Sequence, residues 1–174
     1  MQRDRRHDSV MASSVVAFHG SLGNAAILAR DMGDPAWVDL YHEGHDVDAA
    51  RNICSAFESV VLVGYSMGGS VMGHLSHVLG NIAAVVLYES PLLGIDRPAG
   101  TFPVLWIRND YRWTNQREIE FAETRAAWGE SHHVDEMIGQ GRHIRFVWGC
   151  PVIGHAWDQQ LNPAIRDWIK HHSN

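Results

Sequence analysis

The sequence predicts an α/β protein, a single doubly wound and mostly parallel six-stranded sheet with helices on both faces. Short apolar runs alternate along the chain with segments of helical period. Several of these runs are apolar at every position, as expected for strands that helices cover on both sides, and this favours a parallel sheet. The length of 174 residues corresponds to one domain, expected over 1–174.

The predicted elements follow one another in a βαβα order. Strands are expected at 14–18, 36–40, 59–63, 83–88, 104–107 and 144–148. Helices are expected at 25–32, 47–57, 67–79, 115–128 and 157–171. We expect residues 1–12 to form a flexible N-terminal extension.

Two connections break this rhythm. Residues 90–101 contain two prolines and two glycines, so we expect an irregular loop there. Residues 129–142 are weakly patterned, which predicts a loop with one short helix. A loop of this kind is also a candidate for a substitute lid over a functional site.

Charge and cysteine content bound the partners. Fourteen Lys and Arg against twenty Asp and Glu give a net charge of -6, which provides no basic surface for nucleic acid. Apolar stretches fall short of the roughly 18–20 residues that cross a bilayer, so we expect no membrane span. Cys54 and Cys150 are too few for a disulfide framework, which predicts a cytoplasmic location. The Arg-rich start superficially resembles a secretory signal, but no small-residue cleavage site follows it.

The strongest chemical signal is the motif Gly64-Tyr65-Ser66-Met67-Gly68, between the predicted strand 59–63 and the helix that follows. A serine on such a tight turn has a strained backbone, and its hydroxyl projects from the edge of the sheet. Glycines flank it because a β-carbon there would collide with a neighbouring strand or helix. Glycine-rich turns also occur in non-catalytic α/β folds, but this context predicts that Ser66 is a nucleophile.

A serine hydroxyl needs a base within hydrogen-bond reach. His155 follows the last predicted strand and precedes the last helix, which places it at the carboxyl edge of the sheet with Ser66. His133, in the weakly patterned stretch, is the alternative base. The sequence therefore predicts His155 as the residue that takes the proton of Ser66.

Two carboxylates compete to orient that histidine. Asp110 comes just beyond the predicted strand 104–107, and Glu89 ends the preceding predicted strand. We favour Asp110 because Ser66, Asp110 and His155 then follow the chain order Ser, Asp, His of this arrangement. Glu89 stays open as the alternative acid.

Backbone N–H groups must stabilise the oxyanion that forms during acyl transfer. One is expected from Met67, directly after the nucleophile at the helix start. The other is expected from Ser21, with Leu22 as the alternative, in the loop that follows the first strand. His19 is expected to form hydrogen bonds that hold this loop.

Other polar and aromatic clusters receive simpler interpretations. The acids and histidines of 42–48 precede a helix and predict a solvated loop with an N-capping acid rather than a metal site. No phosphate-binding loop or dinucleotide fingerprint is present, so we expect neither cofactor nor metal. Trp113 and Trp157, near Asp110 and His155 in the sequence, are expected to line the acyl or leaving-group pocket.

The chain resembles the α/β-hydrolase superfamily over nearly its whole length. The His19-Gly20 loop, the Ser66 motif, Asp110 and His155 stand in the order of that family. The usual first two antiparallel strands are missing, and no cap domain fits in 90–101, so the chain is similar to minimal bacterial lipases and short serine hydrolases related to the retinoblastoma-binding hydrolase. Asp110 follows its strand more closely than the common family pattern, although the short serine hydrolases have a similarly compact turn.

These residues together predict a cofactor-free serine hydrolase that cleaves a small-molecule ester through an acyl-enzyme. A thioester or amide is the alternative substrate, since the same acyl-enzyme chemistry serves all three. A non-catalytic protein that binds a ligand or another protein is the contrasting hypothesis. The oligomeric state stays open.

Overall fold

The computed structural model describes residues 13–19, 24–42, 46–90, 101–109, 122–123, 126, 134–139, 144–147, 150–153 and 157–173. In the described part, the elements in chain order are β1 (Ser14–Phe18), α1 (Ala25–Met32), β2 (Leu40–His42), α2 (Val47–Cys54), β3 (Val60–Tyr65), α3 (Gly68–Val78), β4 (Ile82–Tyr88), β5 (Val104–Asn109), β6 (Val134–Gly139), β7 (Ile144–Val147), β8 (Cys150–Ile153), the 3₁₀ turn η1 (Gln159–Leu161) and α5 (Asn162–His172).

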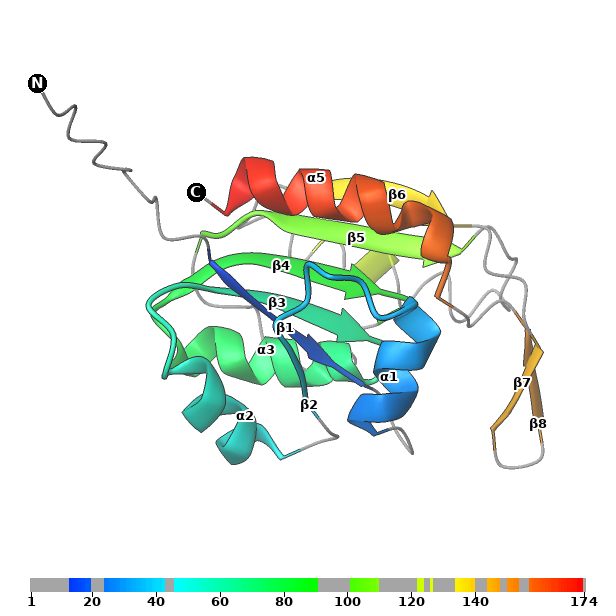
Figure 1. The fold of residues 1–174 in the computed structure, drawn as a ribbon, viewed down its shortest axis with the longest axis horizontal. Coiled ribbons are helices and arrows are strands. Elements are labelled where there is room, and N and C mark those ends of the chain that lie inside the picture. The colour runs from blue at the N-terminus through cyan, green and yellow to red at the C-terminus, as the bar shows by residue number, and fades with distance from the viewer. Residues whose placement is uncertain are drawn as a thin grey trace, which may run out of the picture.

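Six strands form one sheet in the order β2-β1-β3-β4-β5-β6, and every neighbouring pair is parallel. The prediction of a six-stranded, doubly wound parallel sheet is therefore confirmed. The strands run in one direction, so the arrowheads of β3, β4 and β5 end at the same side of the molecule (Figure 1). Residues that follow these strands are brought to one edge of the sheet.

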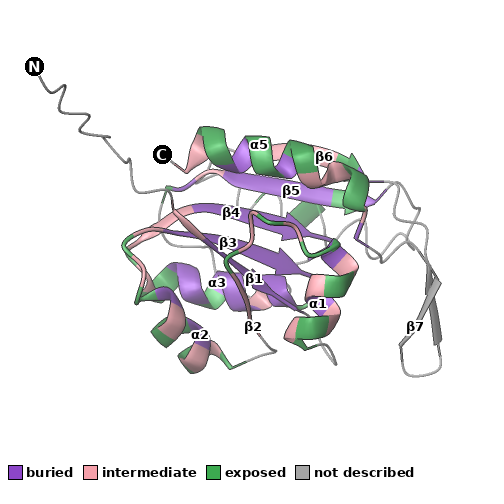
Figure 2. Cartoon of the chain, in the orientation of Figure 1, coloured by how far each residue is buried: buried purple, intermediate pink, exposed green. Residues whose placement is uncertain are grey.

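The buried core has two halves, one on each face of the sheet, because side chains of a strand alternate between its faces. On β1, Val15 and Ala17 pack with α1 and α5, while Val16 and Phe18 pack with α2 and α3. The central strands are almost wholly buried (Figure 2). The runs of apolar residues in these strands follow from this double cover.

The sixth strand of the sheet differs from the prediction. Residues 144–147 form β7, which pairs with β8 in a separate antiparallel hairpin. The sheet instead ends with β6, inside the stretch expected to be a loop or a lid. The charged residues Asp135 and Glu136 interrupt the apolar pattern that would predict β6 as a strand. Both charges are accommodated in the structure because each has a partner. Asp135 accepts a hydrogen bond of 2.6 Å from the indole of Trp168 on α5, and Glu136 pairs with Arg108 at 2.8 Å.

Other elements agree with the predictions, apart from shifted bounds. The strand expected at 36–40 lies at Leu40–His42, and α2 and α3 end earlier than expected. Asp46 is the N-cap of α2, where its carboxylate accepts a hydrogen bond of 2.9 Å from Ala49 N, as predicted for the acids of 42–48. The predicted helix 115–128 and the extension 1–12 lie outside the described residues, apart from three helical positions in the former. Among the helices that are described, none has the length and apolar character to cross a membrane.

Candidate functional site

The turn between β3 and α3 carries Ser66 at the carboxyl edge of the sheet. β3 ends at Tyr65, Ser66 and Met67 form the turn, and α3 begins at Gly68. The φ angle of Ser66 is +57°, in the left-handed region that non-glycine residues rarely adopt. Such a conformation costs about 1–3 kcal/mol. The predicted strained strand–turn–helix context of Ser66 is therefore confirmed.

The glycines of the motif allow close approach at this turn. A β-carbon on Gly68 would collide with the carbonyl oxygen of Phe18 at the end of β1. A β-carbon on Gly64 would lie 2.9 Å from the backbone nitrogen of Gly69 and 2.9 Å from the Met72 side chain. The predicted reason for the glycines is confirmed, because α3 begins in direct contact with β1 and β3.

The end of β4 holds this turn from the other side. The hydroxyl of Ser90 lies 2.5 Å from the carbonyl oxygen of Ser66 and 3.0 Å from that of Gly64. The backbone N–H of Ser66 donates to the carbonyl oxygen of Tyr88 over 2.9 Å. Ser90 is fully buried. The strained backbone at Ser66 is thus bonded at both its nitrogen and its oxygen to residues 88–90.

Glu89, the alternative acid, is buried at the same edge. Its φ is +48°, and only 1% of the residue is exposed. Its carboxylate accepts a hydrogen bond from the backbone N–H of Asn109, and its own backbone N–H donates to Ile107 O over 2.9 Å. Glu89 therefore joins the carboxyl ends of β4 and β5. Its partner Asn109 directly precedes Asp110 in the chain.

Tyr88 makes two hydrogen bonds through one hydroxyl. The O–H donates to Oδ1 of Asn109 over 2.8 Å and accepts from the backbone N–H of Asp158 over 2.7 Å. Burial, together with the charges of Asp158 and Glu89, raises the pKa of Tyr88 above its ordinary value, although its two hydrogen bonds act in the opposite direction. The hydroxyl therefore remains a neutral donor over the working pH range.

Aromatic rings pack beneath the edge on the side of α1 and α5. The ring of Trp157 stacks on Tyr88 with centroids 4.2 Å apart, and Tyr65 meets both rings edge-on at 5.9 Å. His19, at the end of β1, meets Tyr65 edge-on at 5.8 Å and is buried. Trp157 is only 5% exposed and belongs to the core, so the expectation that it lines a substrate pocket is not supported.

The predicted site residues fall into two groups. Ser66 and Met67 lie at the carboxyl edge, with Met67 39% exposed. Ser21, Asp110 and His155 lie outside the described residues, as do the alternatives Leu22 and His133 and the predicted pocket residue Trp113. Among the described residues within two positions of Ser21, Asp110 and His155 in the chain, His19, Asn109 and Trp157 are buried.

Sequence reasoning missed the parts played by Tyr88, Ser90 and Asn109. Their signal was present, because a Tyr-Glu-Ser sequence ends an otherwise apolar strand, and Asn109 ends the next strand. Polar side chains in these positions are buried only when they are hydrogen-bonded. Which atoms they bind depends on strands that are far apart in the sequence.

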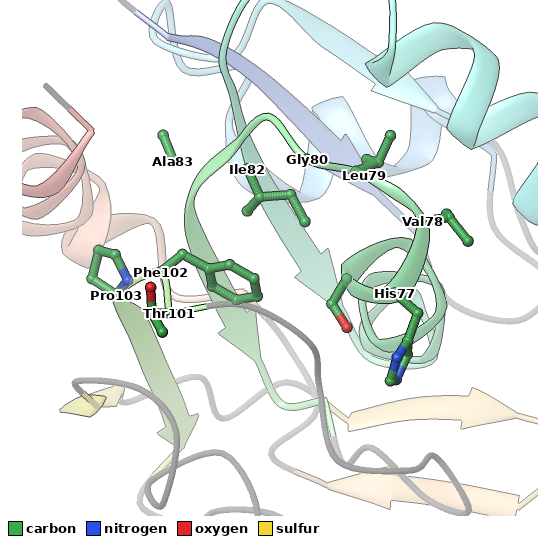
Figure 3. Close-up of a pocket in the computed structure, with 10 residues that line it drawn as sticks. His77, Val78, Leu79, Gly80, Ile82, Ala83, Thr101, Phe102 and Pro103 are labelled. Carbon is green, nitrogen blue, oxygen red and sulfur yellow. The ribbon is translucent and has the colours of Figure 1, made fainter.

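A hollow of about 620 Å³ lies at the opposite edge of the sheet, between the end of α3 and the starts of β4 and β5 (Figure 3). Its wall includes His77 and Val78 from α3, Ile82 from β4, and Phe102 just before β5. Ser66 follows β3 at the other edge, so this hollow is not part of the candidate active site.

Comparisons with known proteins give structural matches. A scan with protein-family models gives no match, and a search of curated proteins gives none either. The structure of YahD with malic acid matches with a TM-score of 0.64 and 9% identity, over 92% of this chain and 94% of that chain. The Pyrococcus furiosus esterase matches with a TM-score of 0.59 and 10% identity, over 94% of this chain and 84% of that chain.

A third match is a protein of the alpha/beta hydrolase superfamily from Xanthomonas campestris pv. campestris, with a TM-score of 0.51 and 14% identity, over 92% of this chain and 95% of that chain. Identities this low show the fold alone. The strand order, the Ser66 turn and these likenesses agree, and the chain has the α/β-hydrolase fold.

Proposed function

We propose that this protein is a serine hydrolase that cleaves a carboxylic ester through an acyl-enzyme. The observation that carries the proposal is the +57° φ of Ser66 between β3 and α3, at the carboxyl edge of a sheet with the α/β-hydrolase fold. A strained serine persists only where the surroundings hold it, and the bonds from Tyr88 and Ser90 do so here.

In the proposed reaction, Ser66 Oγ attacks the ester carbonyl carbon while His155 takes the hydroxyl proton. The tetrahedral oxyanion accepts hydrogen bonds from the backbone N–H of Met67 and of Ser21, or of Leu22 in its place. His155 returns the proton to the leaving alcohol as the C–O bond breaks. Water, deprotonated by His155, then attacks the acyl-enzyme, which releases the acid and restores the Ser66 hydroxyl.

Asp110 is the proposed acid that orients His155, and Glu89 is the alternative. The carboxylate of Glu89 already accepts the backbone N–H of Asn109. This hydrogen bond gives Glu89 a structural role, which the acid that orients His155 does not require. We therefore keep Asp110 in the catalytic role, in the order Ser66, Asp110, His155.

The proposed substrate is a small-molecule ester with a short or exposed acyl group. Residues 134–139, which the sequence left open as part of a lid, form an edge strand of the sheet instead. Residues 90–101 are too few for a cap with an apolar face of its own. Rates measured across the critical micelle concentration of a medium-chain ester test this, because a sharp rise at that threshold would indicate a lid.

The experiment that tests the function combines turnover with covalent labelling. Purified protein is assayed on p-nitrophenyl esters and acyl-CoA thioesters, and a fluorophosphonate probe is followed by peptide mapping to Ser66. Ser66→Ala is expected to lose both turnover and label while the fold persists, because the turn serine contributes chemistry more than packing. Ser76→Ala is the matched control, since this serine lies near the far end of α3, where its hydroxyl donates to Gly73 O over 2.6 Å.

Each alternative has its own signature in this experiment. Faster turnover of thioesters than of esters would assign thioesters as the substrate class, with the same acyl-enzyme mechanism. Absence of both label and turnover in the wild-type protein would favour the non-catalytic binding hypothesis. Turnover that persists in Ser66→Ala would assign the nucleophile to another residue.

A further inference from the structure

One buried hydroxyl joins two segments that are 49 residues apart in the chain. The O–H of Tyr88 bonds to Oδ1 of Asn109 and to the backbone N–H of Asp158, at 2.8 Å and 2.7 Å. Asn109 directly precedes Asp110, and Asp158 follows His155 by three residues. The carbonyl oxygen of the same Tyr88 accepts the backbone N–H of Ser66.

The Tyr88 hydroxyl and its partner Asn109 are buried, and a neighbouring glycine leaves space for them. Tyr88 is 0% exposed and Asn109 is 3% exposed. Gly139, the last residue of β6, leaves the space they occupy, because a β-carbon there would collide with Asn109 Oδ1 and lie 2.8 Å from the Tyr88 hydroxyl. The lack of a side chain at Gly139 is a second, independent observation, and it favours a role for Tyr88 and Asn109 that depends on their positions.

The segment after His155 is also held by its neighbours. Trp157 stacks on the Tyr88 ring at 4.2 Å, and its indole N–H donates to Asn162 Oδ1 over 2.8 Å. Asn162 in turn donates from its side-chain amide to Met32 O at the end of α1, also over 2.8 Å. Tyr88 is thus the point at which this segment meets the strand beside the nucleophile.

We propose that Tyr88 is a positioning residue of the hydrolytic site, whose hydroxyl sets the distance between the segments that carry Asp110 and His155. This inference rests on the proposed function. The hydroxyl does not touch the substrate in this role. It acts through Asn109 on the acid and through Asp158 on the base, while the Tyr88 main chain holds Ser66.

Loss of the hydroxyl should therefore act on catalysis and not on binding. A misplacement of about 1 Å between reacting groups can lower a rate by about 100-fold. A carboxylate near a histidine favours the imidazolium and raises its pKa. If the Asp110 and His155 segments separate, the pKa of His155 falls, and the acid limb of the pH profile moves to lower pH.

The test compares Tyr88→Phe with Tyr41→Phe. Tyr41 lies on β2, three strands away from β4, so the control deletes the same oxygen from a tyrosine of the same sheet. We expect Tyr88→Phe to lower kcat and the rate of fluorophosphonate labelling of Ser66 by about 10- to 100-fold. KM should change by less than about threefold, and the acid limb of kcat/KM should move to lower pH. Tyr41→Phe should match the wild type in all four measurements.

Asn109→Ala is the second variant, and it keeps the proposal testable if Tyr88→Phe does not fold. It removes the acceptor of the Tyr88 hydroxyl and leaves the backbone N–H that Glu89 binds. We expect the same fall in kcat and the same movement of the acid limb. In the double variant the two effects should not add, because both substitutions break one connection.

Three results would overturn the proposal. One is a Tyr88→Phe protein that unfolds at a lower temperature yet keeps the wild-type kcat and pH profile, since a purely structural tyrosine behaves in that way. Another is a change in KM alone. The third is full additivity of Tyr88→Phe and Asn109→Ala. Failure of the proposed function is recognised separately, because the wild-type protein would then show neither label at Ser66 nor turnover.

Discussion

The two ends of β4 are both fastened by side-chain hydrogen bonds, yet they differ in backbone strain. At the amino end, the side-chain amide of Asn81 donates to the carbonyl oxygens of Cys54 and Phe57 at 3.0 Å and 2.8 Å. At the carboxyl end, Ser90 binds the carbonyl oxygens of Gly64 and Ser66. Two of the three described non-glycine residues with positive φ, Ser66 and Glu89, lie at this second end.

Side-chain hydrogen bonds to backbone carbonyl groups therefore have different roles at the two ends of β4. At the amino end the bonds satisfy carbonyl groups after a helix, where α2 leads into β3. At the carboxyl end they hold a conformation that the chain would otherwise leave, and strain of this kind clusters at functional sites. Substitutions at the two ends should therefore have similar effects on stability but different effects on activity.

The largest effect is expected at the base. His155→Ala should lower kcat about as much as Ser66→Ala, because the members of a triad act as a unit and their losses do not add. Steady-state turnover of a p-nitrophenyl ester measures it, with Ser66→Ala and the double variant alongside. A larger loss of kcat in His133→Ala than in His155→Ala would assign the base to His133, which precedes β6 in the chain.

The acids should come next. Asp110→Asn offers His155 the wrong hydrogen-bond partner and should lower kcat by up to about 10⁴, as the corresponding substitution does in the serine-protease example of this mechanism. Glu89→Gln keeps an oxygen that accepts the backbone N–H of Asn109, so its effect should be mild. Comparison of the two kcat values decides between them, and the reverse ranking would assign the acid to Glu89.

Ser90→Ala tests the strained end of β4 directly. It removes the hydroxyl that binds the carbonyl oxygens of Gly64 and Ser66, so the turn is free to relax. We expect kcat to fall by about tenfold and the free energy of unfolding to fall by about 1–3 kcal/mol. Urea unfolding and ester turnover on the same preparation measure both. Unchanged activity with reduced stability would show that the turn keeps its shape without Ser90.

Asn81→Ala is the matched change at the unstrained end. Loss of its two hydrogen bonds should lower the free energy of unfolding by about 1–3 kcal/mol. Activity should stay at the wild-type level at temperatures well below unfolding. A fall in kcat comparable to that of Ser90→Ala would contradict the distinction between the two ends.

The smallest effect concerns Cys54, a second potential nucleophile, which ends α2 on the amino side. Cys54 is fully buried, and burial raises the pKa of its thiol to about 11. The thiolate fraction at pH 8 is then about 100-fold below that of a thiol with the reference pKa of 9.0. In a Cys150→Ser background, a disulfide reagent should modify Cys54 slowly in the folded protein and rapidly in urea. Rapid modification of the folded protein would show that the structure around Cys54, at the end of α2, opens in the native state.

The sequence alone determined the parts of this protein that depend on local pattern. The Ser66 motif contains its own strand, turn and helix signals, and four of the six sheet strands, β1, β3, β4 and β5, show the apolar runs of buried parallel strands. Asp46 was predictable as a cap because the capping bond spans three residues. Signals of this kind are readable because the interacting atoms are close in the chain.

Tertiary structure decided the rest. β6 is a strand although it contains Asp135 and Glu136, because it lies at the sheet edge and α5 supplies the indole of Trp168 as a hydrogen-bond donor. The bond between Tyr88 and Asp158 joins residues 70 positions apart. No local pattern determines such a partner, since it depends on which strands lie side by side and on the space that a glycine of a third strand leaves free.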